Sequence, residues 1–126
     1  MILDTDVLIW YLRGNENALG VIRENIPFDI SVITYMELIQ GMKNKRELEI
    51  LKKYLKDWNV TILQINENVS TRAMFLVENH YLSNSLELGD AIIGITAREN
   101  QQVLLTGNDK HYKIIQDLEI KIFRPD

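Results

Sequence analysis

Four acidic residues stand where apolar runs end or where the following helical stretches begin. They are Asp4, Glu37, Asp90 and Asp109. In an open parallel sheet, ligands gather beyond the carboxyl ends of the strands, so acids at these positions are expected to converge. Converging carboxylates repel one another unless a cation compensates their charge. Oxygen ligands without thiolates favour Mg²⁺ or Mn²⁺, and such an ion suits the hydrolysis of phosphodiester bonds.

Each acid also has a structural explanation when it is considered alone. Thr34-x-x-Glu37 matches a capping box, in which the Glu side chain returns to the amide at the helix start. Asp90 suits the first turn of a helix, because its charge complements the helix dipole. Asp6 suits a helix cap, and Asp109 suits an Asn-Asp turn. The shared position of the four candidate acids at one end of a single predicted sheet favours the metal site.

The elements that must position these acids alternate along the chain. Short runs rich in β-forming residues predict strands over 1–4, 28–33, 60–65, 102–106 and 120–124. Helical periodicity predicts helices over 6–13, 16–24, 34–43, 45–57, 67–81, 89–99 and 111–117. This alternation predicts an α/β fold with a central, mostly parallel sheet covered on both faces. The helix over 89–99 is apolar or small nearly all round, so we expect it to be buried.

Composition excludes several classes of protein. The 126 residues, 46% hydrophobic and 25% charged, suit one ordinary globular domain over 1–126. The absence of cysteine excludes disulfides, zinc–thiolate sites, iron–sulfur clusters and cysteine nucleophiles. The longest stretches without a charged residue span nine residues, against about 20 apolar residues for a membrane helix. The acidic start Asp4-Thr5-Asp6 does not suit a secretory signal, so we expect a cytoplasmic protein with no membrane contact.

The net charge of −4 argues at first against a protein that binds nucleic acid through bulk electrostatics. The chain has 18 acidic and 14 basic residues, and the four candidate acids account for the whole difference. If these acids share one site, the remaining surface is neutral and a bound cation offsets the site itself. The acidic balance is therefore compatible with an RNA substrate.

Four motifs in order connect the candidate acids with a known family. They are Asp4-Thr5-Asp6-Val7-Leu8-Ile9, Ser31-Val32-Ile33-Thr34-x-x-Glu37-Leu38, Asp90-Ala91-Ile92-Ile93-x-x-x-Ala97 and Leu104-Leu105-Thr106-x-Asn108. Their order and spacing resemble the PIN-domain nucleases, and within them the VapC-type toxins of bacterial and archaeal toxin–antitoxin pairs. The resemblance runs from residue 1 to about residue 112. It implies a three-layer α/β/α sandwich whose clustered acids bind Mg²⁺ or Mn²⁺ and cleave RNA.

The resemblance assigns roles to residues of the first three motifs. Asp4, Glu37 and Asp90 match the three core acids that hold the metal and carry catalysis. Thr5 and Asp6 match neighbours that hydrogen-bond and orient the first acid.

The fourth motif leaves two candidates for the last ligand. Family members often carry Thr-x-Asp or Thr-x-Asn here, which aligns Thr106 with a supporting role and Asn108 with the fourth site. Asp109 stands one place further on and is expected as the fourth catalytic and metal-binding acid, with Asn108 as the alternative. Asn108 in the fourth site would leave three firm carboxylates and a weaker claim to a second metal. His111, beside Asp109, is a minor catalytic candidate.

The resemblance also implies partners. VapC-type toxins form homodimers and are silenced by a cognate protein antitoxin whose tail enters the active-site groove. Tyr11 is a candidate for a dimer or antitoxin contact, whereas Trp58 is expected in the core. Five basic residues are candidate contacts to the RNA backbone, with ordinary solubilising charge as the alternative: Arg13, Lys43, Lys45, Arg46 and Lys110.

Two other functions remain open from the sequence. Ile2-Leu3-Asp4-Thr5-Asp6 also resembles the start of haloacid-dehalogenase-like phosphohydrolases, in which Asp4 would be a nucleophile. That scheme expects a second acid shortly after Asp90, which is missing, and gives Glu37 no role. A non-catalytic PIN-like interaction module is the other alternative, through the Asn at position 108.

Overall fold

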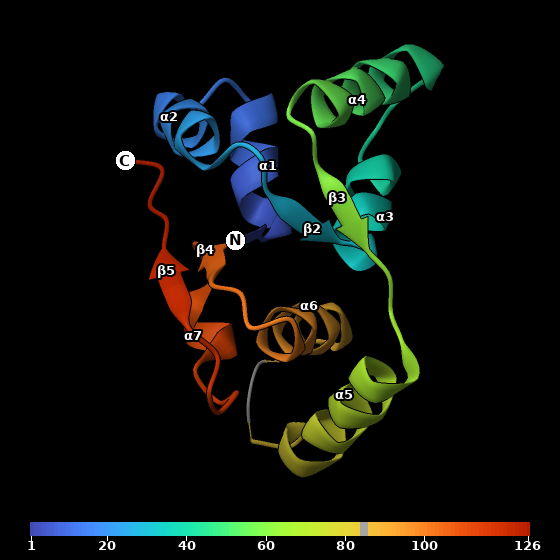
Figure 1. Cartoon of the computed structure of the whole chain (residues 1–126), viewed down its shortest axis with the longest axis vertical. Coiled ribbons are helices and arrows are strands. Elements are labelled where there is room, and N and C mark those ends of the chain that lie inside the picture. The colour runs from blue at the N-terminus through green and yellow to red at the C-terminus, as the bar shows by residue number, and fades with distance from the viewer. Residues whose placement is uncertain (84–85) are drawn as a thin grey trace.

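A parallel sheet forms the centre of the computed structural model, which describes residues 1–83 and 86–126 (Figure 1). Its strands, in chain order, are β1 (Ile2–Leu3), β2 (Asp29–Ser31), β3 (Thr61–Leu63), β4 (Leu104–Thr106) and β5 (Ile120–Ile122). They lie in the order β3-β2-β1-β4-β5, and every neighbouring pair is parallel. The predicted parallel α/β architecture is therefore confirmed, although the strands are shorter than the periodicity indicated.

Helices cover both faces of the sheet. They are α1 (Thr5–Leu12), α2 (Glu16–Asn25), α3 (Val32–Gln40), α4 (Lys45–Asp57), α5 (Glu67–His80), α6 (Leu88–Glu99) and α7 (Asp109–Tyr112). In Figure 1, α1, α2 and α4 lie beyond one face, and α5, α6 and α7 lie beyond the other. Among the described residues, no helix is long and apolar enough to cross a membrane.

Two hydrophobic cores lie on opposite faces of the sheet because side chains alternate along each strand. Leu3, Ile30 and Leu105 belong to the core beneath α1, α2 and α4. Ile2 and Leu104 belong to the core beneath α5, α6 and α7. All five side chains are at most 1% exposed. The central strand β1 is thus covered on both sides. Asp4, which follows Leu3 directly, therefore lies in the interior of the molecule.

Two predicted boundaries were wrong, and both concern the site. The helix expected over 34–43 begins at Val32, because the Ser31 hydroxyl accepts a hydrogen bond of 3.1 Å from the Ile33 amide and caps it. Thr34 is therefore inside α3, and its capping-box interpretation does not hold. The helix expected over 111–117 spans only Asp109–Tyr112, which places Asp109 in a helical first turn rather than in a plain turn.

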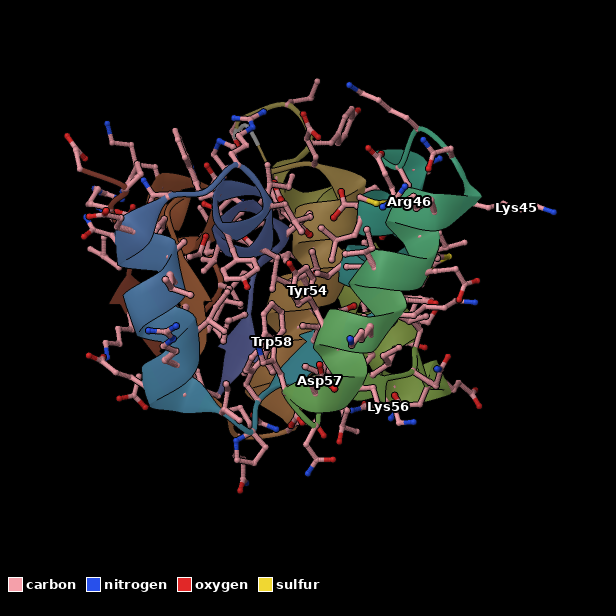
Figure 2. The ribbon with its side chains drawn as sticks, turned by 90° about the horizontal axis from the view of Figure 1, so that it is seen from above. Lys45, Arg46, Tyr54, Lys56, Asp57 and Trp58 are labelled. Atoms are coloured by element: carbon pink, nitrogen blue, oxygen red, sulfur yellow. The ribbon has the colours of Figure 1, made fainter. Side chains whose placement is uncertain are left out.

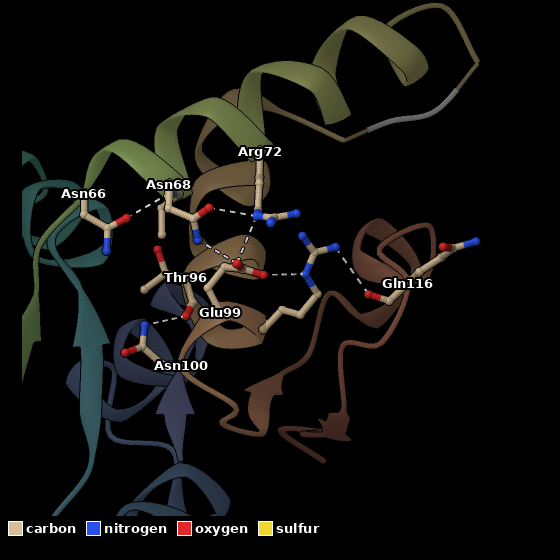
Figure 3. A network of polar contacts seen from close by, with 9 residues as sticks. Asn66, Asn68, Arg72, Thr96, Glu99, Asn100 and Gln116 are labelled. Carbon is tan, nitrogen blue, oxygen red and sulfur yellow. Dashed lines mark hydrogen bonds and ion pairs between the residues drawn. The ribbon is translucent and has the colours of Figure 1, made fainter.

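The expected burial of the helix over 89–99 is confirmed for most of α6. Its buried residues are Ala91, Ile93, Gly94, Ile95, Thr96 and Ala97. Near its end, Glu99 accepts a hydrogen bond of 2.7 Å from Asn68 of α5 and forms ion pairs with Arg72 (3.0 Å) and Arg98 (3.1 Å; Figure 3). The Asn68 hydrogen bond is the main cause that lowers the pKa of Glu99. These contacts fix α6 against α5 at the end remote from Asp90.

Aromatic residues join α4 to α1 over the first core. Tyr54 and Trp58 stack with ring centroids 5.3 Å apart, and Tyr11 packs edge-on against both. In Figure 2, Tyr54 and Trp58 lie on the inner face of α4, whereas Lys45 projects away from the molecule. The expected core position of Trp58 is confirmed, since it packs against the buried cluster of this face.

Gly94 tests how closely α7 must approach α6. A Cβ atom at this position would overlap Ile115 Cδ1 and would lie 3.1 Å from Tyr112 Cδ1. We expect Gly94→Ala to lower the free energy of unfolding by about 1–3 kcal/mol, which is the usual cost of overpacking a core. Urea denaturation followed by circular dichroism measures this loss.

Gly20→Ala is the matched control, because it also lies in a helix but has open space around the added methyl group. We expect it to be neutral or to stabilise by up to about 1 kcal/mol through helix propensity. Equal stability of Gly94→Ala and the wild type would contradict the close approach of α7.

Candidate active site

Asp4 is the most deeply buried carboxylate of the described residues and lies directly after the central strand. Its side chain caps α1 by accepting a hydrogen bond of 2.8 Å from the Thr5 amide. The strand register pairs Leu3 with Leu105, so Asp4 meets Thr106, whose hydroxyl donates to Oδ2 at 2.7 Å. The residue is 3% exposed. Burial, together with the nearby charge of Asp6, raises the pKa of Asp4 to about 7.

Asp6 connects the first turn of α1 to the end of β4. Its Oδ2 accepts a hydrogen bond of 2.9 Å from the Gly107 amide, and its Oδ1 is buried without a hydrogen-bond partner. Burial raises the pKa of Asp6. A Cβ atom at Gly107 would lie 2.6 Å from Oδ2, so only glycine permits this approach.

Glu37 is exposed but is tied to the buried end of α1. The Thr5 hydroxyl donates a hydrogen bond of 2.7 Å to its Oε1 and lies 3.0 Å from the Thr34 hydroxyl. The other carboxylate oxygen faces the start of α6, where a Cβ atom at Gly89 would lie 3.5 Å from Oε2. Glu37 therefore stands between the elements that carry Asp4 and Asp90.

Asp90 lies in the first turn of α6, with its side chain 19% exposed. Its Oδ2 contacts His111 Nδ1 at 3.2 Å and accepts a long hydrogen bond of 3.4 Å from the Glu87 amide. Its Oδ1 faces the Tyr112 hydroxyl at 3.4 Å. Asp90 thus lies in the first turn of a helix, as expected, where its charge complements the helix dipole, and it also belongs to the acidic cluster.

The two candidates for the fourth ligand differ in their surroundings. Asp109 Oδ1 forms an ion pair of 2.9 Å with Arg124, and this hydrogen bond holds the pKa of Asp109 below its usual value. The backbone amide of Asn108 donates to the Thr106 hydroxyl at 2.9 Å, and its side chain is exposed. Arg124, which no pattern singled out, supplies the positive charge that faces Asp109.

Tyr112 is the other residue that sequence reasoning missed. Its side chain is fully buried, and its hydroxyl donates a long hydrogen bond of 3.4 Å to Asp90 Oδ1. Burial raises the pKa of this phenol far above its ordinary value, so the group is a neutral donor among acids. The sequence gives no reason to single out Tyr112. A tyrosine at an apolar position of a short helix is usually an ordinary core residue.

The donors fit a hard divalent cation in atom type and in charge. Asp4 and Asp6 are buried acids with raised pKa values, which mark a missing positive charge, and Asp6 Oδ1 is an unpaired buried oxygen. In residues 1–83 and 86–126, however, no group of three His, Asp or Glu side chains stands ready to hold an ion.

A groove of about 620 Å³ lies beside Glu37, between α1, α3 and α4. Arg13 and Lys43 are among the residues that line it, together with apolar side chains of the three helices. Of the other expected RNA contacts, Lys45 and Arg46 lie at the start of α4 (Figure 2), and Lys110 is exposed on α7. The structure therefore brings two of the five basic candidates to the groove beside the acids.

Comparison with known proteins finds similarity along nearly the whole chain. The family model described as PIN domain matches residues 1–116. A curated protein named Ribonuclease VapC10, from Mycobacterium tuberculosis, is 30% identical over 123 residues, which cover 94% of this chain and 90% of that protein.

Solved structures give the same result at the level of the fold. A toxin–antitoxin complex from Klebsiella pneumoniae contains a chain that matches with a TM-score of 0.79 and 26% identity, over 99% of this chain and 97% of that one. A VapBC-1 structure from nontypeable Haemophilus influenzae matches with a TM-score of 0.77 and 25% identity, over 96% of both chains.

The burial of Asp4 predicts a pH dependence of stability in the metal-free protein. The folded carboxyl titrates near 7 and the unfolded one near 3.8, so between these values the unfolded chain binds fewer protons. We expect the free energy of unfolding of the wild type, measured in EDTA by urea denaturation, to fall by a few kcal/mol from pH 4 to pH 8.

Asp4→Asn is expected to lose most of that fall, because its uncharged amide keeps an acceptor for the Thr5 amide. A divalent cation should restore the stability of the wild type at pH 8 and leave the variant unchanged. An identical pH dependence in the two proteins would exclude Asp4 as its source.

Proposed function

The chain belongs to the PIN-domain family, and from that membership we propose that it is a metal-dependent endoribonuclease, the toxin of a VapBC-type toxin–antitoxin pair. The observation that carries this proposal is the buried carboxylate of Asp4, which accepts hydrogen bonds from the Thr5 amide and the Thr106 hydroxyl and whose pKa is raised to about 7. Carboxylates with strongly raised pKa values cluster at functional sites. We regard residues 1–126 as one catalytic domain that works in the cytoplasm.

Asp4, Glu37 and Asp90 are the proposed ligands of Mg²⁺ or Mn²⁺. When bound, such an ion activates water and neutralises the negative charge that builds up on the phosphate during hydrolysis. The chain contributes the orientation of the acids: the Thr5 amide and the Thr106 hydroxyl hold Asp4, and the Thr5 hydroxyl holds Glu37. Asp6 supports this arrangement by its hydrogen bond to the Gly107 amide.

The fourth position is proposed to be structural. Arg124 already neutralises Asp109, and Asn108 contributes its backbone amide to Thr106 rather than its side chain. This arrangement favours a site of three carboxylates and a single metal ion. The Asp109–Arg124 ion pair then serves to hold the segment after β5 against the end of β4, where Arg124 also donates to the Gly107 carbonyl oxygen.

The groove beside Glu37 is the proposed path of the RNA backbone. Arg13 and Lys43 line it and supply positive charge next to the acids. The relatives are described as a ribonuclease and as parts of toxin–antitoxin complexes. We therefore propose a cognate antitoxin and a homodimer as the partners of this chain as well.

Substitution of the proposed ligands tests the activity directly. We expect Asp4→Asn and Asp90→Asn to lose RNA cleavage in Mg²⁺ or Mn²⁺ by more than about a hundredfold, the upper end for partners that only support a metal ligand. Asp57→Asn, on the exposed end of α4, is the matched control and should cleave like the wild type. Gel analysis of a labelled RNA pool gives the rates.

Cleavage retained in both variants would refute the proposed mechanism. Hydrolysis of p-nitrophenyl phosphate without any effect on RNA would instead favour the phosphohydrolase scheme, in which Glu37 has no role.

The fourth position has its own test. We expect Asp109→Asn to retain metal-dependent cleavage within about tenfold of the wild type, since its carboxylate faces Arg124 and serves to hold the chain. Cleavage rates at saturating and limiting Mn²⁺ make the comparison with Asp90→Asn. A loss in Asp109→Asn as deep as that in Asp90→Asn would make Asp109 a metal ligand.

A further inference from the structure

Tyr112 is a fully buried tyrosine whose hydroxyl lies among acids rather than in an apolar environment. The side chain has no exposed surface, and its ring belongs to the core beneath α6. A phenylalanine would supply the same ring contacts. The hydroxyl therefore needs a separate explanation, because burying a polar group costs free energy unless a hydrogen bond compensates it.

The Tyr112 hydroxyl can reach the acidic cluster because Gly94 has no side chain in the space that the Tyr112 ring fills. Gly94 lies four residues after Asp90 on α6, so the two residues share one helix face. A Cβ atom at Gly94 would lie 3.1 and 3.3 Å from Tyr112 Cδ1 and Cε1, which means that the ring fills the space beside the glycine. One helical turn is about 5.4 Å, close to the length of a phenol, and the hydroxyl thus reaches back to Asp90.

Both carboxylate oxygens of Asp90 have a contact with α7. Tyr112 approaches Oδ1 at 3.4 Å, and the preceding residue, His111, approaches Oδ2 with Nδ1 at 3.2 Å. The two contacts come from consecutive residues of α7, which follows β4 directly. The Tyr112 hydroxyl is thus a neutral donor beside Asp90, in a cluster whose acids would otherwise repel each other.

We propose that Tyr112 is a positioning residue of the metal site: its hydroxyl contacts Asp90 and orients the Asp90 carboxylate for the ion. This inference rests on the proposed metal-dependent function. Partners that orient metal ligands reduce the reorganisation that binding requires, and their loss typically costs about 10–100-fold in metal affinity. The hydroxyl contributes by preorganisation and needs no direct contact with the metal or with RNA.

Tyr112→Phe tests the proposal because it removes the hydroxyl and keeps the ring beside Gly94. Calorimetric titration of the metal-free protein with Mn²⁺, in the absence of RNA, is expected to give an affinity about 10–100-fold below that of the wild type. Tyr54→Phe is the matched control, since it removes a phenol hydroxyl from the aromatic cluster on α4, and should bind Mn²⁺ like the wild type. Urea denaturation in EDTA verifies that each variant is folded.

The outcomes separate this inference from the proposed function. Wild-type and Tyr112→Phe proteins that bind Mn²⁺ equally, or tighter binding by the variant, would overturn the role of Tyr112 and leave the metal site intact. A wild type that binds no divalent cation would overturn both.

A second measurement remains informative if Tyr112→Phe does not fold. Mg²⁺ titration should change the near-ultraviolet absorption of a buried tyrosine in the wild type and in Tyr54→Phe. The absence of this signal in both proteins, with Mg²⁺ binding verified by calorimetry, would also overturn the inference.

Discussion

Burial of the Asp4 carboxylate at the end of the central strand is the constraint on which the rest of the site depends. A charge in this position is unfavourable, and its neighbours are arranged to reduce the cost. The Thr5 amide comes from the helix that Asp4 caps, and the Thr106 hydroxyl comes from the strand beside it. Because β4 lies next to β1 in the sheet, strand order decides which donor meets the acid. A bound cation would add the positive charge that hydrogen bonds alone do not supply.

Much of the fold was predictable because its determinants are local. Alternating strand and helix patterns gave the parallel sheet, and the small, apolar residues of 89–99 gave a buried helix. The errors arose where short-range signals compete. Ser31 and Thr34 both suit a helix start, and the hydroxyl nearer the strand caps α3. Apolar spacing after residue 111 suggested a longer last helix, yet α7 ends at Tyr112 and the backbone takes a positive φ at Asp117.

The site was predictable only in part, for a related reason. Motif spacing singles out Asp4, Glu37 and Asp90 through residue type and position. In the structure, Asp4 and Glu37 contact Thr5 of α1, and Asp90 contacts Tyr112 of α7. Arg124 and Tyr112 act through distant partners, so neither stands out in its own stretch of sequence. In the sequence, Gly94 is one of several small residues of a predicted buried helix. In the structure, the absence of a side chain at Gly94 makes room for the Tyr112 ring.

The hydrogen bond between Thr106 and Asp4 joins residues 102 positions apart, and it has a consequence for the order of synthesis. Asp4 is synthesised before β4 and α7, which carries Tyr112. A nascent chain that carries Asp4 and Glu37 still lacks the strand, the helix and the hydroxyl that complete the cluster. Because of this long-range pairing, the site can assemble only after β4 and α7 have been synthesised.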